Sequence, residues 1–245
     1  MRDWLRRAAL TVLGATWWWA LRVRRAEATA SLARCLPGVA PGPVLRHAVG
    51  SAALGYLELA LGGAIPIQGL DTVADHLRSG RGLWCLAGHL GPWDLLLVRA
   101  SARVPVSIFV RPPSDRISRA AVAALRRAGD LELLDPREGF PAALRAYAAG
   151  RVVVFVQDQR HARGEHVPFF GHAARTSTGL ARALAAHPGP VLWAEAWRAA
   201  DGAPQGALRL LTPPPTQVTA WSQALIEDAV RARPADWWWL HRRWR

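Results

Sequence analysis

The chain of 245 residues contains no lysine and no asparagine, and it has only two cysteines and one methionine. The cysteines, Cys35 and Cys85, are too few for a disulfide framework, and Cys85 lies in an apolar run that is typical of a buried side chain. Cysteine usage therefore gives no indication of an oxidising compartment. The sequence has no Gly-x-Ser-x-Gly, Gly-x-Gly-x-x-Gly or P-loop string, which leaves a nucleophile-elbow esterase and a nucleotide-binding fold without support.

Because lysine is absent, all 31 basic residues are arginine, and the formal net charge is +13. Part of this bias, together with the heavy use of Ala, Gly and Pro, is typical of a GC-rich genome. The positive sign nevertheless favours anionic partners, such as nucleic acid, an anionic membrane face or an acidic carrier protein. The arginines are scattered, without a helix-turn-helix or an aromatic RNA-binding string, so we expect no nucleic-acid partner.

An uncharged run of 14 residues, Ala8–Leu21, lies between arginine clusters and includes three consecutive tryptophans. As a helix it would be about 21 Å long, which is short of the roughly 30 Å hydrocarbon core. Snorkelling arginines and interfacial tryptophans favour a membrane anchor or interfacial helix over residues 1–25. Two alternatives stay open. One is a buried core helix, and the other is a signal peptide cleaved near Ala28–Ala30, although the arginines before that site argue against cleavage.

From residue 65 onward, short apolar runs of strand length alternate with helical patterns. This alternation predicts an α/β domain over residues 26–245 with a mainly parallel central sheet flanked by helices. We expect strands near 82–87, 104–110, 152–156 and 190–195. We expect helices near 27–36, 43–61, 71–79, 92–102, 115–128, 138–149, 178–186 and 217–232.

The run 82–94 starts as a strand, passes through a Gly-His loop and opens a helix at Gly91-Pro92. His89 and Asp94 would not share a face of a continuous helix, because five residues turn about 140° beyond a full circle. They meet only if the chain bends between them, as Gly91-Pro92 allows. We then expect Asp94, as third helical residue, to accept a hydrogen bond from His89, so that the other ring nitrogen becomes a general base. A purely structural hydrogen bond is the alternative.

The segment Ala-Gly-His-Leu-Gly-Pro-Trp-Asp, residues 87–94, resembles the His-x-Gly-x-Trp-Asp/Glu motif of the late acyltransferases of lipid A biosynthesis, within the glycerolipid acyltransferase superfamily. Two further blocks resemble the same family. They are Asp158-Gln159 followed by Val167–Gly171, and the ending Pro234–Arg243. The chain departs from the family in its shorter length and in Pro92, where Asn is commoner.

The resemblance implies further site residues. Arg111 ends the run 104–110 and would point into the same crevice as His89. Arg126 matches the position of a functional arginine, with Arg127 as the neighbouring choice, and Asp158 would orient an arginine or a substrate hydroxyl. A solvated helical arginine is the alternative for each basic residue. Phe169 and Phe170 would line the acyl chain or belong to the core.

The resemblance implies a glycerolipid-acyltransferase-like fold and a membrane-bound acyltransferase. It would move a fatty acyl chain from a thioester, usually on acyl carrier protein, to a hydroxyl of a lipid A precursor or related glycolipid. His89 would be the base, Arg111 and Arg126 would hold phosphate, and backbone N–H groups of residues 91–93 would bind the oxyanion. The domain would face the cytoplasm from the inner membrane.

Several alternatives remain at this stage. A lysophospholipid or other glycolipid acyltransferase would share the chemistry with another acceptor, and a non-catalytic basic protein would bind the membrane alone. His161, Glu165 and His166 lack the spacing of a metal site, so we predict no metal and no cofactor. The acyl-chain length, the oligomeric state and the choice between acyl carrier protein and coenzyme A as donor stay open.

Overall fold

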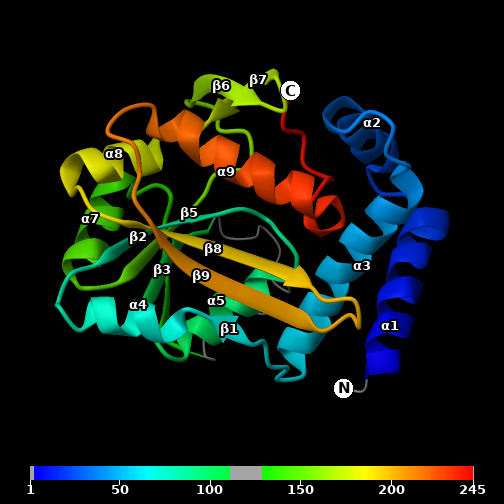
Figure 1. Ribbon diagram of the computed structural model, residues 1–245, viewed down its shortest axis with the longest axis horizontal. Helices are drawn as coiled ribbons and strands as arrows, with labels where there is room; N and C mark the ends of the chain where they lie inside the picture. Colours follow the sequence, from blue (N-terminus) through cyan, green and yellow to red (C-terminus); the bar gives the residue numbers. More distant parts are fainter. Residues whose placement is uncertain (1–2, 111–128, 245) are drawn as a thin grey trace.

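The computed structural model describes residues 3–110 and 129–244, whose main feature is a seven-stranded sheet with the order β1-β9-β8-β2-β5-β3-β4 (Figure 1). The pairs of β2, β3, β4, β5 and β8 are parallel, whereas β9 runs antiparallel to β8. The strands are β1 Ile67–Gln68, β2 Leu83–Ala87, β3 Val106–Phe109, β4 Leu131–Leu134, β5 Val152–Val156, β8 Val191–Arg198 and β9 Pro204–Leu211, and a separate antiparallel hairpin joins β6 Glu165–Phe169 to β7 His172–Thr176.

Helices cover both faces of the sheet, as Figure 1 shows. α4 and α5 pack on one face, and α7, α8 and α9 pack on the other. The helices are α1 Asp3–Thr16, a π-helix Trp17–Leu21, α2 Arg25–Cys35, α3 Pro41–Ala60, α4 Leu70–Leu77, α5 Trp93–Ser101, α7 Phe140–Ala148, α8 Gly179–Ala186, α9 Val218–Ala232 and a short 3₁₀ turn Pro234–Asp236.

The central strand β2 shows why the sheet is buried on both faces. Its side chains alternate, so that Leu83 and Cys85 pack under α4 and α5 while Trp84 and Leu86 pack toward α7, α8 and α9. All five residues of β2 are buried. A continuous apolar run, rather than an alternating one, is what a parallel strand between two helical layers requires.

The predicted α/β architecture with a mostly parallel sheet is confirmed. The antiparallel strand β9, the edge strands β1 and β4, and the β6–β7 hairpin were not predicted. β9 begins with a proline and contains Gly206, and β1 has two residues, so neither carries the long apolar signal of a central strand. The predicted helix 115–128 lies outside the described residues.

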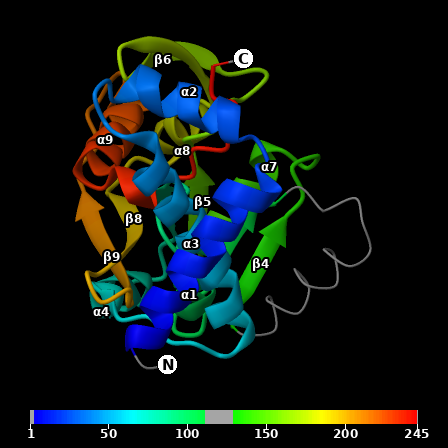
Figure 2. The same ribbon diagram turned by 90° about the vertical axis from the view of Figure 1, so that its right-hand side faces the viewer.

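The N-terminal helix α1 packs on α3 through two glycines. A Cβ at Gly14 would lie 2.2 Å from the backbone oxygen of Arg46, and one at Gly50 would lie 2.3 Å from that of Leu10. Close backbone contact therefore holds α1 against α3, and Figure 2 shows both helices with α2 on one side of the molecule. No helix within residues 3–110 and 129–244 is long and apolar enough to cross a membrane.

Candidate active site

The loop between β2 and α5, residues 88–92, lies at the carboxyl end of a central strand, where parallel sheets bind their ligands. Gly91 bends this loop with a φ of +54°, and a Cβ there would lie 2.6 Å from the backbone oxygen of Ala196. The predicted bend is therefore confirmed, and glycine is the residue that fits it. α5 begins at Trp93, so Asp94 is its second residue rather than its third.

His89 pairs with Asp158, which follows β5, the neighbour of β2 in the sheet. Nδ1 of His89 lies 2.8 Å from Oδ1 of Asp158, and the backbone N–H of His89 donates to Oδ2 over 2.9 Å. The Asp158 side chain is 2% exposed, whereas the His89 side chain is 22% exposed. One ring nitrogen is thus fixed on a buried carboxylate while the ring remains reachable from outside.

The carboxylate bonded to His89 is therefore not the one that the sequence predicted. Within the described residues, the hydrogen bonds of the His89 ring go to Asp158 and Gln159, and Asp94 acts on the ring through its charge. Asp94 and the hydroxyl of Tyr56 on α3 instead influence each other's pKa. The His89 ring still lies edge-on to Trp93, the first residue of α5, with ring centroids 4.9 Å apart, but its hydrogen-bonded carboxylate comes from the end of the neighbouring strand β5.

The electrostatics of the pair favour a charged imidazole. Burial alone would lower the pKa of His89, but the charge and hydrogen bond of Asp158, together with the charge of Asp94, raise that pKa above its ordinary 6.5. Burial alone would raise the pKa of Asp158, but the His89 charge and the hydrogen bonds from His89 and Trp237 hold it well below its usual range. Asp158 is thus ionised at neutral pH and stabilises a proton on His89.

Asp94 has the opposite environment. Burial raises the pKa of Asp94, against the lowering effects of the Tyr56 hydrogen bond and the His89 charge. Burial and the Asp94 charge also raise the pKa of Tyr56, so its hydroxyl remains a donor. The two carboxylates near His89 therefore differ, since one is firmly ionised and the other is more easily protonated.

Sequence reasoning missed three residues of this site: Gln159, Tyr56 and Trp237. Nε2 of Gln159 lies 3.1 Å from Nε2 and 3.3 Å from Nδ1 of His89, so the amide lies beside the imidazole ring. The indole N–H of Trp237 donates to Oδ2 of Asp158 over 2.8 Å. Gln159 and Trp237 lie inside the blocks that carried the family resemblance, whereas the position of Tyr56 on α3 offered no signal.

Two cavities meet at His89. One, of about 250 Å³, is lined by Asp94, Gln159 and Asp236 together with apolar residues such as Ala48, Ala52 and Leu95. The other, of about 420 Å³, extends along the ends of β3 and β4. Its apolar wall includes Leu97, Ile108, Phe109, Leu131, Leu133 and Val156. We call them the polar chamber and the apolar chamber. His89, Trp93, Asp94, Tyr56 and Gln159 line both.

The remaining predicted residues lie elsewhere. Arg111 and Arg126 lie outside the described residues, so their phosphate-binding role stays a prediction. Phe169 and Phe170 belong to the core, at 0% and 6% exposure, rather than to a chamber wall. The described residues contain no group of three or more His, Cys, Asp or Glu side chains that could hold a metal ion.

The fold and the site together define an α/β protein that presents a histidine–carboxylate pair between a polar and an apolar cavity. The chain belongs to the bacterial lipid A biosynthesis acyltransferase family, whose model matches residues 56–245. It is therefore an acyltransferase acting in lipid A synthesis, and the resemblance to the late acyltransferases is confirmed. No curated protein matches the chain significantly.

Proposed function

We propose that this protein transfers a fatty acyl chain from the thioester of acyl carrier protein to a hydroxyl of a lipid A precursor or related glycolipid, with His89 as general base and Asp158 as its partner. The observation that carries the proposal is the 2.8 Å contact between Nδ1 of His89 and Asp158 at the junction of the two chambers. The contact assigns the ring proton to Nδ1 and leaves Nε2 as the basic nitrogen.

The reaction needs no covalent acyl-enzyme. Nε2 of His89 accepts the proton of the acceptor hydroxyl, and the oxygen attacks the thioester carbonyl. The C–O bond forms, the C–S bond breaks, and the thiolate takes the proton back from the imidazolium. Asp158 stabilises that imidazolium through the hydrogen bond, and Asp94 adds a second negative charge nearby.

The oxyanion of the tetrahedral intermediate requires a hydrogen-bond donor. Of the three candidates at residues 91–93, Gly91 already donates its N–H to the backbone oxygen of Asp236 over 2.6 Å, and Pro92 has none. The N–H of Trp93, in the first turn of α5, is the remaining one. We assign the oxyanion to this helix N-terminus, where the backbone dipoles favour negative charge.

We assign the acyl chain to the apolar chamber and the acceptor to the polar chamber. A volume of about 420 Å³ with aliphatic walls is the kind of space that buries a flexible apolar ligand. Asp94 and Gln159 line both chambers, and the polar chamber adds the carboxyl group of Asp236 for a hydroxylated acceptor. Both chambers reach His89, so the hydroxyl and the thioester meet there.

Leu133 on β4 tests the acyl assignment in two directions. We expect Leu133→Trp to fill part of the chamber and shift the preferred donor to chains several carbons shorter, and Leu133→Ala to shift it to longer ones. Competition among thioesters of different lengths, with products separated by mass spectrometry, measures the shift. Leu133→Met conserves the side-chain volume and is the control. An unchanged product profile in both the Trp and the Ala variants would contradict the assignment.

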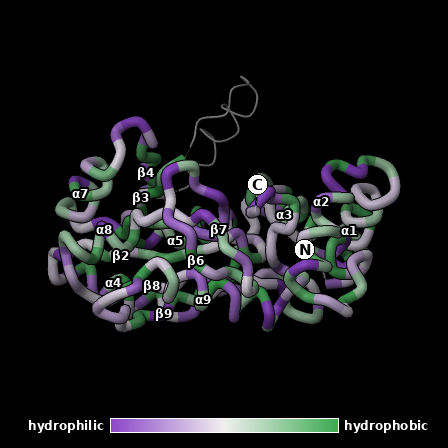
Figure 3. The backbone as a smooth tube through the Cα atoms, turned by 90° about the horizontal axis from the view of Figure 1, so that it is seen from above, coloured by the Kyte–Doolittle hydropathy of each residue, from purple (hydrophilic) through white to green (hydrophobic). Residues whose placement is uncertain are grey.

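We also propose that the N-terminal helices lie on the membrane. Nine of the ten exposed large apolar side chains of the described residues fall between residues 4 and 61. They are Trp4, Leu5, Val12, Trp19, Leu21, Val23, Tyr56, Leu57 and Leu61. α1 and α3, which carry five of them, lie side by side at one end of the molecule in Figure 3. The arginines interspersed with them fit an anionic surface.

Trp19→Glu combined with Leu21→Glu is expected to reduce binding to vesicles of anionic phospholipid at least about tenfold, because each change places a charge at the apolar surface. Vesicle co-sedimentation measures the effect. Leu210→Glu on β9 is the matched control, since Leu210 is the one exposed large apolar residue of the described chain outside this region. Equal binding of the double variant and the wild type would refute membrane contact through this face.

The proposed reaction is tested with purified protein, an acyl thioester of acyl carrier protein and a lipid A precursor. Transfer of the chain to the precursor supports the proposal, and transfer only to a lysophospholipid would replace the acceptor by the alternative one. Lipid mass spectrometry of a deletion strain identifies the natural product by its missing acyl chain. Because the proposed donor is cytosolic, we place the catalytic domain at the cytoplasmic face of the inner membrane.

A further inference from the structure

The C-terminal segment, residues 236–243, contacts the His89 loop and also the residues after β5, Asp158 and Gln159. The Gly91 N–H donates to the backbone oxygen of Asp236, and the Trp238 N–H donates to that of His89 over 3.1 Å. Leu90 and Trp237 form an isolated antiparallel bridge. The backbone of the His89 loop is thus paired with the end of the chain, nearly 150 residues away in sequence.

The Asp158 carboxylate accepts hydrogen bonds from His89 and from one other side chain of the described residues, which is Trp237 in this segment. Its indole N–H and the backbone N–H of His89 both donate to Oδ2, at 2.8 and 2.9 Å, while Oδ1 bonds the His89 ring. Three donors therefore define the plane and position of one carboxylate. The indole N–H can only donate a hydrogen bond, so Oδ2 of Asp158 must be the acceptor in this contact.

We propose that Trp237 is a positioning residue for the acyl transfer, which fixes the Asp158 carboxylate so that it holds the His89 ring in its basic tautomer. The role of Trp237 in catalysis rests on the proposed function, in which His89 is the general base. Trp237 touches no chamber and no reacting atom, and it acts only through Asp158.

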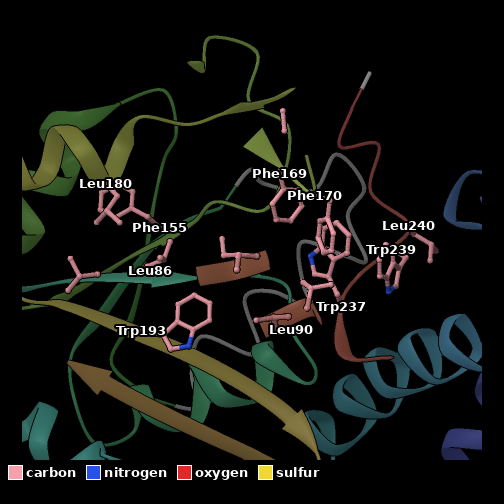
Figure 4. Close-up of a cluster of buried hydrophobic side chains, with 14 of the residues drawn as sticks. Leu86, Leu90, Phe155, Phe169, Phe170, Leu180, Trp193, Trp237, Trp239 and Leu240 are labelled. Atoms are coloured by element: carbon pink, nitrogen blue, oxygen red, sulfur yellow. The ribbon is translucent and has the colours of Figure 1, made fainter. Parts of the chain in front are cut away.

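The indole is itself held rigidly. It is 2% exposed and packs edge-on against Trp239 and Phe169, with ring centroids 4.6 and 5.6 Å away, and stacks on Phe170 at 6.5 Å. Figure 4 shows Trp237 among these rings, close to Leu90 of the catalytic loop. This packing fixes the orientation of the indole N–H, so that little further conformational entropy is lost when it donates to Asp158.

Other charged groups face the same pair from neighbouring elements. Asp94 acts on His89 from α5, and the charge of Asp158 raises the pKa values of His241 and Arg243 in the C-terminal segment against the effect of burial. Arg243 also donates to the backbone oxygen of Gln159 and to Oε1 of Gln223 on α9. None of these donates a hydrogen bond to Asp158 in the described contacts, so removing the Trp237 N–H removes a contact that they do not replace.

Trp237→Phe deletes the N–H and retains an aromatic ring. Oδ2 of Asp158 then loses a donor, the carboxylate attracts the His89 proton more strongly, and the pKa of His89 rises further. Because His89 must be neutral to act as base, we expect the acidic limb of the pH profile of kcat/KM to move upward by about half a unit to one unit. We also expect kcat to fall roughly tenfold with little change in KM, as for loss of a supporting hydrogen bond.

Trp239→Phe is the matched control. Trp239 is equally buried, at 1% exposure, but its indole N–H donates to the backbone oxygen of Pro234 over 2.7 Å. We expect it to lower the Tm without moving the acidic limb. Trp237→Tyr, whose hydroxyl can donate toward Asp158, is expected to restore the limb toward that of the wild type.

The titration of the His89 ring, followed by NMR in wild type and variants, separates this inference from the proposed function. A raised His89 pKa in Trp237→Phe alone supports the inference whether or not acyl transfer is found. Equal His89 titration and equal pH limbs in Trp237→Phe and Trp239→Phe would overturn it, even with acyl transfer established in the wild type. Acyl transfer absent in the wild type would end the proposed function.

Discussion

Asp158→Asn is expected to lower turnover by roughly 10³–10⁴-fold while leaving the fold intact, because the amide reverses the tautomer of His89. The amide oxygen can still accept from Trp237 and from the backbone N–H of His89 on the Oδ2 side. Its NH₂ group then faces Nδ1 of His89 and makes that nitrogen an acceptor. The ring proton moves to Nε2, which loses the lone pair that would deprotonate the acceptor hydroxyl.

Asp94→Asn is the comparison variant, because it shows which of the two carboxylates near His89 is the essential partner. Asp94 acts on His89 through charge and has its own partner in Tyr56, so we expect a loss of about tenfold, far smaller than for Asp158→Asn. Initial rates of acyl transfer, with Tm from circular dichroism for each variant, measure both. An equal or larger loss in Asp94→Asn would show that the carboxylate of the sequence motif, and not Asp158, is the essential partner.

His89→Ala is expected to lower turnover by about 10²–10⁴-fold, the contribution typical of a positioned general base. It should also abolish the acidic limb of the pH profile. In the wild type we expect this limb above the ordinary histidine value of 6.5, because Asp158 and Asp94 outweigh burial and raise the pKa of His89. Activity is therefore lost as the pH falls through this raised pKa, which protonates the base.

The measurement is the pH dependence of kcat/KM in wild type and His89→Ala. The His89 side chain is part-exposed, and Asp158 is the buried charge that loses a partner when His89 is truncated. Asp158 keeps the hydrogen bond from the indole N–H of Trp237. A residual acidic limb at the same pH in His89→Ala would mean that another group titrates. Unchanged turnover would remove His89 from the chemistry altogether.

Local patterns were sufficient for the scaffold. The apolar runs at 82–87 and 152–156 predicted two strands of a mainly parallel sheet, and Gly91-Pro92 predicted a bend after His89. These features depend on burial and on backbone sterics within a few residues, so they can be read from neighbours in sequence. Short or antiparallel edge strands such as β1 and β9 lack that signal, because packing rather than composition creates them.

The sequence by itself determined that His89 stands at a strand end beside a glycine bend and that Asp158 ends another strand. Only the tertiary structure decided that these two meet, across 69 residues, and that Trp237 joins them from a further 79 residues away. The sheet order, which places β5 next to β2, sets which carboxylate reaches the imidazole. Strand adjacency comes from the packing of the whole domain, and hydrogen bonds of about 2.8 Å depend on that adjacency rather than on spacing along the chain.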